Sequence, residues 1–463
     1  MSLIKSISGI RGTIGGRPGD GLSPVDVVKF TSAFATFLLR SKNDGRLKMV
    51  VGRDARLSGD MVDRLVVASL VGMGVDVVET GLSTTPTTEM AVINHKADGG
   101  VIITASHNPM QWNALKLLNS RGEFIDAAEG AEVLRIAGQD DYSYADVSDL
   151  GSVTIDDTTI DRHIEQVLSL ALVDREAVAA AHFKVAVDAV NSTGGIAIPR
   201  LLRALGVNDI VELNCEPTGR FAHNPEPIPQ NLTQISHAVK TNGCDLGIVV
   251  DPDVDRLALV CETGDMFGEE YTLVSVADYV LSHTPGNTVS NLSSSRALRD
   301  VTARYDGCRY SAAAVGEVNV TTLMRQTSAV IGGEGNGGVI YPELHYGRDA
   351  LVGVALFLTL LAKKGCNVSQ LRATYPEYII SKNRIDLTPD IDVDSLLARV
   401  AAKYKATPQC DVTTIDGVKI DFADGWVHLR KSNTEPIIRV YSEAKSESRA
   451  DELAAQVMNE IRD

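Results

Sequence analysis

The 463-residue sequence has a deficit of positive charge. It contains 44 Lys and Arg residues against 60 Asp and Glu residues, which gives a formal net charge of −16 at pH 7. A nucleic-acid-binding protein needs a basic face that contacts phosphates, so this deficit argues against nucleic acid as a partner. A small anionic ligand remains compatible with the composition, because it needs only a local positive pocket.

Cysteine is scarce, and long apolar runs are absent. The six cysteines are widely spaced, with no pair at Cys-x-x-Cys spacing, which indicates reduced thiols in the core of a cytosolic protein. The opening residues MSLIKSISGIRG lack the continuous apolar segment of a signal peptide. The longest apolar run, residues 351–362, suits a buried helix and is too short to span a bilayer. We therefore expect a cytoplasmic protein that makes no membrane contact.

The length predicts three or four domains, because single hydrophobic cores stop growing near about 250–300 residues. A similar pattern occurs at residues 48–79, 184–212 and 287–314. Each segment has a short apolar strand, a polar turn, an amphipathic helix, a glycine and a second strand. This is the order of a βαβ unit in a mostly parallel sheet. The pattern predicts three similar α/β domains.

The last part of the chain has a different pattern. After about residue 375, alternating segments such as VKIDF and WVHLR are joined by Asp-Gly turns at residues 416–417 and 424–425. Alternation and tight turns predict an antiparallel sheet in a small α+β domain. The predicted domains are three α/β domains and this α+β domain, at residues 1–150, 151–257, 258–370 and 371–463.

Three carboxylates follow an apolar strand in the segment DLGIVVDPDVDRLALV, residues 245–260. Asp251, Asp253 and Asp255 occupy alternate positions, and side chains two apart in an extended chain point to one side. Their hard oxygen atoms favour Mg²⁺ or Ca²⁺. An EF-hand loop is disfavoured, because Arg256 stands where that loop needs glycine. A solvated acidic turn is the alternative interpretation.

Two later segments carry groups that could bind a phosphorylated sugar. The segment RKSNTEPIIRV, residues 430–440, combines cationic side chains with hydroxyl, amide and turn-forming backbone donors, a set suited to phosphate. The alternative is a hairpin with solvated charges. The glycine-rich segment from residue 330 contains Glu334 and Asn336, which could bind sugar hydroxyl groups. The alternative there is a long flexible turn.

Ser106 lies in the polar segment TASHNP, residues 104–109, between two apolar stretches. A serine hydrolase would need a Gly-x-Ser-x-Gly elbow, and the segment has none. Adjacent side chains of an extended segment point to opposite sides, so we expect His107 to be poorly placed as a base for Ser106. The segment alone also fits a polar loop that closes a strand without any chemistry.

Four motifs stand in an order that resembles the α-D-phosphohexomutase family, which includes phosphoglucosamine mutase, phosphomannomutase and phosphoglucomutase. They are TASHNP, DPDVDR, GEGNGG and RKSNTEP, at residues 104–109, 251–256, 333–338 and 430–436. The resemblance covers essentially the whole chain. It implies three related α/β domains with mixed, mostly parallel sheets and a C-terminal α+β domain with an antiparallel sheet, arranged around a central cleft.

The resemblance implies a role for each motif. Ser106 would be a phosphoserine, and its phosphate would join the three aspartates in binding one Mg²⁺ ion. The sugar would be bound by Glu334 and Asn336. The phosphate that is not transferred would be held by Arg430, Ser432, Asn433, Thr434 and Arg439. Further catalytic groups beside these motifs would be Arg11, His107, Lys116 and Arg256.

Lys116 stands alone among leucines. If those leucines are core, the Lys116 amine is partly buried, and desolvation would lower its pKa and favour a role as general acid or base. A surface lysine whose ammonium group reaches solvent is the alternative.

The resemblance also implies a reaction. A hexose 6-phosphate and a hexose 1-phosphate would be interconverted through phosphoserine and a hexose 1,6-bisphosphate, which is also the activator. We expect glucosamine phosphate as the substrate, with mannose and glucose phosphates as the alternative. A sugar-phosphate-binding protein without catalytic activity is the remote alternative. The expected partner is this small molecule, with neither nucleic acid nor membrane, and the chain would be a monomer or homodimer.

The glycine-rich loop departs from the family pattern. The family loop usually reads Gly-Glu-x-Ser-Gly-His, whereas Asn336 and Gly338 stand here in place of the serine and the histidine. We hypothesise that His345 enters the cleft in place of that histidine. The alternative is a surface histidine.

Overall fold

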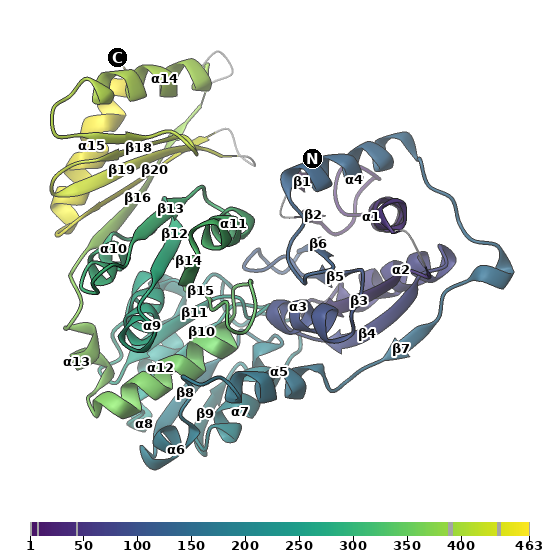
Figure 1. The fold of residues 1–463 in the computed structure, drawn as a ribbon, viewed down its shortest axis with the longest axis horizontal. Helices are drawn as coiled ribbons and strands as arrows, with labels where there is room; N and C mark the ends of the chain where they lie inside the picture. The colour runs from purple at the N-terminus through teal and green to yellow at the C-terminus, as the bar shows by residue number, and fades with distance from the viewer. Residues whose placement is uncertain (1, 7–8, 43–44, 388–391, 433–436, 463) are drawn as a thin grey trace. The chain divides into compact units, whose positions relative to one another are not determined.

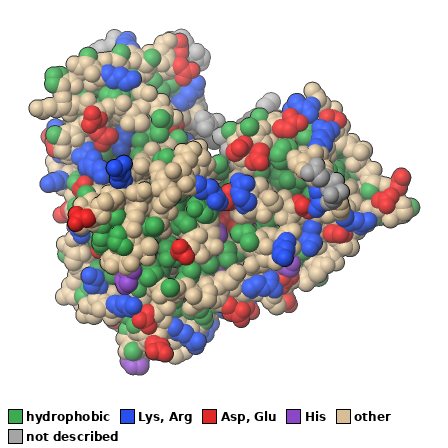
Figure 2. Space-filling view, viewed as in Figure 1, with side chains coloured by type: hydrophobic (Ala, Val, Ile, Leu, Met, Phe, Trp, Pro, Cys, Tyr) green, Lys and Arg blue, Asp and Glu red, His purple; other side chains and the backbone are tan. Residues whose placement is uncertain are grey.

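The computed structural model describes residues 2–6, 9–42, 45–387, 392–432 and 437–462. The chain divides into two compact units, which are described separately. The first unit comprises Met1–Tyr279 and Asn336–Arg372, and the second comprises Val280–Gly335 and Ala373–Asp463. Side chains of both charge signs are interspersed over the visible face (Figure 2).

The first unit opens with a seven-stranded mixed sheet (Figure 1). In sheet order its strands are β1 (Ile4–Ser6), β2 (Gly9–Thr13), β6 (Trp112–Asn119), β5 (Gly99–Ile103), β3 (Lys48–Arg53), β4 (Asp76–Leu82) and β7 (Val153–Ile155). Its helices are α1 (Pro24–Ser41), α2 (Gly59–Gly72), α3 (Thr85–Asn94) and α4 (Ala127–Gln139), followed by the 3₁₀ helix η1 (Val147–Asp149). Apolar residues of α1, α2 and α4 share one core, and α3 contributes to another.

A second sheet of the first unit has four strands. In sheet order they are β11 (Leu257–Cys261), β10 (Leu246–Val250), β8 (Lys184–Asp188) and β9 (Asp209–Leu213). Around them lie α5 (Thr159–Leu168), α6 (Arg175–Ala180), α7 (Gly194–Ala204), η2 (Pro229–Asn231) and α8 (Thr233–Asn242). The unit also contains β15 (Gly338–Ile340), α12 (Ala350–Lys364), α13 (Val368–Arg372) and the start of α9 (Glu269–His283).

The second unit contains a parallel sheet and an antiparallel sheet. The parallel strands are β13 (Tyr310–Ala313), β12 (Asn287–Asn291) and β14 (Ala329–Glu334), with helices α10 (Ala297–Thr302) and α11 (Glu317–Thr327). The antiparallel order is β16 (Ile379–Asp386), β20 (Ile437–Ala444), β19 (Gly425–Lys431), β18 (Val418–Asp421) and β17 (Asp411–Thr413). This sheet shares a core with α14 (Val393–Lys405) and α15 (Glu447–Arg462).

The predicted fold class is confirmed. The three repeats form β3–α2–β4, β8–α7–β9 and β12–α10–β13, and each pair of strands is parallel. The first Asp-Gly turn joins β17 to β18, and the second leads into β19. The apolar run at residues 351–362 lies in α12, whose residues Ala350–Leu361 are buried. No helix in the described part of the chain is long and apolar enough to cross a membrane.

The domain boundaries stay predictions, as does the central cleft. One boundary divides a hairpin, because β11 pairs with β10 and extends this sheet to Cys261, past residue 257. An antiparallel edge strand of this kind is not part of a βαβ pattern, which explains why the repeat alone did not indicate it.

One buried carboxyl group predicts a pH effect on stability. Burial, and then the charge of Glu79 on β4, raise the pKa of Asp63 on α2 to about 7 from 3.8. A raised folded-state pKa contributes stability below the unfolded pKa, and this contribution is lost as the pH rises through about 7.

We therefore expect Asp63→Asn to increase the free energy of unfolding above pH ~7. The gain over the parent should shrink by up to about 1.4 kcal/mol per pH unit as the pH falls from ~7 towards ~5. Urea unfolding of both proteins across this pH range measures the difference in their free energies of unfolding. Asp161→Asn, an exposed change on α5, is the control. A gain that does not depend on pH would contradict the assignment.

Candidate active site

Ser106 is held in a left-handed turn after β5. Its φ is +48°, a conformation that non-glycine residues rarely adopt. The Ser106 N–H donates to Thr104 Oγ1 at 3.0 Å, and its hydroxyl donates to Asp251 Oδ2 at 2.8 Å. The side chain is buried, with a residue exposure of 7%. The turn therefore fixes the Ser106 hydroxyl against a carboxylate that comes from a different sheet.

Arg56 organises this serine loop, and sequence reasoning assigned it no role. It is 1% exposed, and its Nε donates to Asp54 Oδ2 at 3.0 Å. Its guanidinium group also donates to four backbone carbonyl oxygens of the loop, those of Ser106, Asn108, Pro109 and Trp112. Arg56 lies outside the four motifs that carry the resemblance, and no sequence signal indicates that one arginine spans this loop.

The three aspartates converge, as predicted. Asp251, Asp253 and Asp255 follow β10, are 0% exposed, and present carboxylate oxygens that all lie within 4.8 Å of one another. The alternative of a solvated acidic turn is therefore wrong. Burial, and then the charges of the two other aspartates, raise the pKa of Asp251 well above its usual range. Crowded buried carboxylates of this kind need a compensating cation.

The aspartate cluster fits a hard divalent metal ion. Within the described ranges, Asp253 Oδ1 and Asp255 Oδ1 have no hydrogen-bond donor. Three converging carboxylates, two of which have an uncommitted oxygen atom, suit Mg²⁺, which binds oxygen ligands and is held by a few carboxylates together with water or phosphate. The cluster can therefore bind one metal ion.

In addition to Ser106, two buried cations and the hydroxyl group of a threonine contact the aspartates. Lys116 Nζ lies 2.7 Å from Asp253 Oδ2 and 3.7 Å from Asp255 Oδ2. Arg348 Nη2 donates to Asp255 Oδ2 at 2.6 Å, and Thr85 Oγ1 donates to Asp253 Oδ2 at 2.7 Å. Sequence reasoning missed Arg348 and Thr85, because both lie outside the motifs that carry the resemblance.

The expectation for the pKa of Lys116 was wrong. Lys116 is buried at 6% exposure, which confirms its core position and excludes the surface alternative. Burial acts to lower its pKa, but the charges of Asp253 and Asp255 outweigh burial, so that the pKa is raised. The carboxylates come from another sheet, so the sequence around Lys116 could not indicate them. The ammonium group therefore neutralises the cluster.

His107 is better placed than expected. Its Nδ1 lies 3.4 Å from Ser106 Oγ. The expectation that the two side chains diverge was wrong, because it assumed an extended segment and Ser106 has a left-handed backbone. The positive charge of Arg256, and then burial, hold the pKa of His107 well below its usual range. The imidazole is therefore neutral at neutral pH.

Arg11 and Arg256 complete the group around Ser106. Arg11 Nη1 donates to Asn108 Oδ1 at 3.4 Å in the serine loop. The Arg256 backbone N–H donates to Asp251 Oδ1 at 3.2 Å, and its Nε lies 3.8 Å from Asp255 Oδ1. Burial, and then Arg256, lower the pKa of Arg11. The first unit thus brings together the predicted metal ligands and the predicted catalytic residues.

In the second unit, Glu334 is 4% exposed at the end of β14. Its Oε1 accepts hydrogen bonds from Asn291 Nδ2 at 2.8 Å and from the Gly316 N–H at 3.1 Å. Asn336 belongs to the first unit, where its Oδ1 accepts from the Gly338 N–H at 3.3 Å. Their joint action on a sugar stays a prediction.

Two of the predicted phosphate residues, Arg430 and Arg439, lie on the antiparallel sheet of the second unit. Arg439 on β20 stands opposite Arg430 on β19 and opposite Arg384 on β16. Sequence reasoning missed Arg384, which precedes the motif by more than forty positions. Directly opposed like charges disfavour strand pairing unless an anion lies near them, so this row of arginines favours phosphate.

Two other contacts shape the same end of the sheet. Arg430 Nε lies 2.9 Å from Asp416 Oδ2, and the Ser432 N–H donates to the Ile437 carbonyl oxygen at 3.0 Å. Asn433 and Thr434 lie outside the described residues.

His345 corrects a further expectation. It is 5% exposed, so the surface alternative is wrong. Its ring nitrogens lie 3.4 Å from Glu89 Oε2 and 3.3 Å from Asp349 Oδ2, and its ring contacts that of His163. His345 therefore packs in a buried polar cluster, and its entry into the cleft stays a prediction. Glu89 and His163 come from helices distant in sequence, and no motif indicated them.

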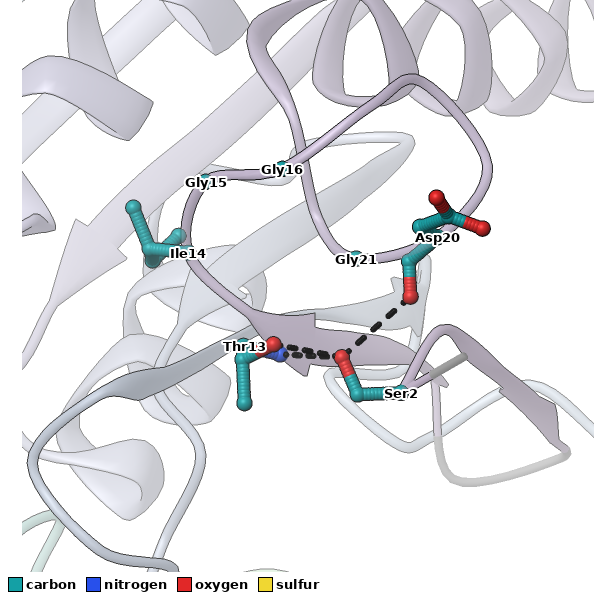
Figure 3. Close-up of a pocket in the computed structure, with 7 residues that line it drawn as sticks. All are labelled: Ser2, Thr13, Ile14, Gly15, Gly16, Asp20 and Gly21. Atoms are coloured by element: carbon teal, nitrogen blue, oxygen red, sulfur yellow. Dashed lines mark hydrogen bonds between the residues drawn. The ribbon is translucent and has the colours of Figure 1, made fainter.

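A hollow of the first unit follows β2 (Figure 3). It is lined by Ser2, Thr13, Ile14, Gly15, Gly16, Asp20 and Gly21. Ser2 Oγ lies 2.5 Å from Thr13 Oγ1 and donates to the Asp20 carbonyl oxygen at 3.3 Å. The Asp20 carboxylate points away from Ser2 in this view. These polar groups bond to one another, and the hollow lacks the convergent charges of the Ser106 site.

The fold and this site define a phosphoryl-transfer enzyme of the α/β class. Family models of phosphoglucomutase/phosphomannomutase match along the chain: α/β/α domain I at residues 3–143, domain II at 161–264, domain III at 268–378 and the C-terminal domain at 389–460. The chain belongs to the phosphoglucomutase/phosphomannomutase family, the α-D-phosphohexomutases. It is therefore an isomerase, an intramolecular phosphotransferase that acts on hexose phosphates.

Relatives from archaea and a bacterial structure cover nearly the whole chain. A phosphoglucomutase/phosphomannomutase of Thermococcus kodakarensis is 36% identical over 95% of this chain and 96% of its own. A probable phosphoglucosamine mutase of Methanopyrus kandleri is 33% identical over 98% and 97%. A crystal structure of a family protein from Burkholderia thailandensis has a TM-score of 0.84 at 27% identity, covering 99% and 97%.

Addition of Mg²⁺ is expected to raise the midpoint of thermal unfolding, because the ion offsets the repulsion among the buried aspartates. In chelator, Asp251→Asn should be more stable than the parent by about 1–3 kcal/mol, since it removes one crowded charge. It should also lose most of the Mg²⁺ response. Differential scanning calorimetry measures both effects. Asp265→Asn, at an exposed turn, is the control. An undiminished response in Asp251→Asn would contradict the metal assignment.

Proposed function

We propose that the protein interconverts glucosamine 6-phosphate and glucosamine 1-phosphate through a phosphoserine at Ser106 and a 1,6-bisphosphate. The contact that carries this proposal joins Ser106 Oγ to Asp251 Oδ2 at 2.8 Å. A hydroxyl group fixed against three buried carboxylates suits a phosphate ester that shares a cation with them. Hexose 1,6-bisphosphate would be both intermediate and activator, because it can phosphorylate Ser106.

In the first transfer, the bond between phosphorus and Ser106 Oγ breaks, and a bond between phosphorus and the sugar O1 forms. The sugar hydroxyl group loses one proton, and Ser106 Oγ gains one. Bound at Asp251, Asp253, Asp255 and the phosphate, Mg²⁺ would neutralise charge on the transferring group. Arg11 and Arg256 would add positive charge on the same group, and this electrostatic stabilisation is the main catalytic requirement of phosphoryl transfer.

We assign to His107 the role of donating the proton that Ser106 Oγ gains, because His107 Nδ1 lies 3.4 Å from this oxygen. The positive charge of Arg256 lowers the pKa of His107 in the free protein. A bound phosphate brings negative charge, which raises the proton affinity of the imidazole during transfer. Lys116 would neutralise the aspartates when the metal is absent and would be released from them by the ion.

The second transfer requires the bisphosphate to present its other phosphate to Ser106. We assign the binding of the distal phosphate to Arg430, Ser432 and Arg439, together with Asn433 and Thr434. Arg384 would support this site, since it stands opposite Arg439 in the sheet. Glu334 would bind sugar hydroxyl groups or the amine. A site that binds only the phosphate group, and does not contact the rest of the sugar, could accept either end of the bisphosphate.

The alternative substrate pair is mannose and glucose phosphate. It is favoured by the 36% identical relative named phosphoglucomutase/phosphomannomutase, whereas other relatives are named probable phosphoglucosamine mutase. The choice between these substrates depends on how Glu334 and its neighbours bind the substituent at C2 of the sugar.

Phosphorus NMR separates these functions. Glucosamine, glucose and mannose 6-phosphates are each incubated with Mg²⁺ and a trace of the matching 1,6-bisphosphate. We expect the 1-phosphate signal to grow fastest with glucosamine 6-phosphate. Faster conversion of the mannose or glucose compound would establish the alternative. Conversion of none of the three would exclude the proposed substrates, and release of inorganic phosphate would indicate a hydrolase.

A further inference from the structure

A second buried cluster of metal-ligating side chains lies in the first unit, apart from the aspartates. It joins His163 on α5 to His345 and Asp349, which precede α12. His163 Nε2 lies 2.9 Å and His345 Nε2 lies 3.3 Å from the same atom, Asp349 Oδ2. These ligand atoms all lie within 4.8 Å of one another, and the three residues are buried. Three donor atoms therefore converge on one point.

Each member of the cluster is oriented by a contact on its other side. His163 Nδ1 lies 2.9 Å from Thr87 Oγ1, and His345 Nδ1 lies 3.4 Å from Glu89 Oε2. Asp349 Oδ1 accepts the Leu351 N–H at 2.8 Å at the start of α12. Metal-binding histidines in proteins show this arrangement, in which the nitrogen that does not bind the metal donates to a carboxylate or another acceptor.

The charges around His345 favour a cation at this point. Both of its ring nitrogens face carboxylate oxygens, one from Glu89 and one from Asp349. A neutral imidazole has one N–H, so it can donate to one of these carboxylates but not to both, and the second contact needs either a second ring proton or a metal ion at Nε2. With a metal ion, Nδ1–H donates to Glu89 and the Nε2 lone pair binds the metal. A divalent ion would also balance the two buried carboxylates, which are otherwise costly to bury.

The spacing and the donor types indicate which ion fits. Metal–nitrogen bonds of about 2.0–2.1 Å and tetrahedral angles place neighbouring ligand atoms about 3.3 Å apart. The two contacts of Asp349 Oδ2, at 2.9 and 3.3 Å, are close to that value. Two imidazole nitrogens and one carboxylate oxygen form a borderline donor set that prefers zinc or a similar transition metal to Mg²⁺.

We propose that His163, His345 and Asp349 bind one divalent transition-metal ion, with Zn²⁺ as the preferred ion. A water molecule would complete a tetrahedral set. The side chains are almost entirely buried, so the ion has a structural role and does not contact the sugar. It is a second metal site, distinct in position and donor chemistry from the aspartate cluster.

The proposed ion would hold the aspartate cluster in position through two short series of side-chain contacts. Thr85, at the start of α3, donates to Asp253, and Thr87 and Glu89 on the same helix contact the two histidines. Arg348, next to Asp349, donates to Asp255. An ion that ties α3, α5 and the segment before α12 together would therefore hold both series of contacts in place.

The first test measures metal content in protein purified without a metal-affinity tag and dialysed against Mg²⁺ buffer. Mass-spectrometric metal analysis is expected to find about one transition-metal ion per chain in the parent, and less than about a tenth of that in His163→Gln. His95→Gln is the matched control, because His95 pairs with Asp156 at 2.7 Å without a second histidine in that contact. It should retain the ion.

The second test uses Co²⁺ added to chelator-treated parent protein, so that it does not depend on the folding of a variant. We expect visible absorption bands of nitrogen-ligated cobalt, their loss on addition of one equivalent of Zn²⁺, and their persistence in Asp251→Asn. A parent that carries no transition metal and shows no such bands would overturn the proposal. Bands that disappear in Asp251→Asn would also overturn it, since they would arise at the aspartate cluster.

Discussion

Ser106→Ala is expected to reduce mutase turnover by at least about 10⁴-fold, the scale seen when a covalent nucleophile is removed. Alanine has no oxygen to carry the phosphoryl group, whereas positioning groups such as Arg11 and Arg256 remain. The hydrogen bond from Ser106 Oγ to Asp251 Oδ2 is also lost, so we expect the free energy of unfolding to decrease by about 1 kcal/mol. Coupled assays of 1-phosphate formation and calorimetry measure the two quantities.

Ser69→Ala is the matched control for this change. Ser69 is a buried serine on α2 whose hydroxyl group donates to the Leu65 carbonyl oxygen within the same helix. It should retain the activity of the parent and its phosphate content. If Ser106→Ala kept activity within tenfold of the parent, the phosphoryl carrier would have to be another residue.

Arg56→Met is expected to destabilise the protein by about 3–5 kcal/mol, because it leaves the carboxylate of Asp54 buried without its cation. The four loop carbonyl groups that Arg56 holds would lose their donors as well. The left-handed backbone at Ser106 then lacks the contacts that maintain it. We therefore expect a turnover loss of about 100-fold or more even in the fraction that is folded.

Denaturant unfolding and turnover per folded molecule measure the two effects of Arg56→Met separately. Arg64→Met is the control, since Arg64 forms an exposed pair with Asp60 on α2, and exposed pairs contribute at most about 1 kcal/mol. A loss of stability in Arg56→Met without loss of turnover per folded molecule would show that the loop keeps its shape without the arginine.

Local patterns in the sequence predicted much of the fold and the chemical groups of the site. The βαβ repeats could be predicted because the apolar periodicity of a strand differs from that of a helix. The convergence of Asp251, Asp253 and Asp255 could be predicted because they alternate directly after an apolar strand. Lys116 stood out as one charge among leucines. Each of these signals lies within a short stretch of chain, where spacing and residue type are sufficient.

The remaining features depend on contacts between distant segments. The pKa of Lys116 is governed by Asp253 and Asp255, which lie more than 130 positions away. Arg56 acts on a loop about 50 positions further along the chain. His345 could have faced many partners, and Glu89 and Asp349 were not distinguishable from other acids in the sequence. Burial and partner choice at these residues come from tertiary packing.

The central claim is that Ser106 carries the phosphate that moves to and from the sugar. The parent is mixed with glucosamine 1,6-bisphosphate labelled with ³²P, quenched, digested and mapped. We predict label on the peptide containing Ser106, and its transfer into bisphosphate at the turnover rate when unlabelled glucosamine 6-phosphate is added. Label that is absent from Ser106, or that stays there while the isomer forms, would contradict the account.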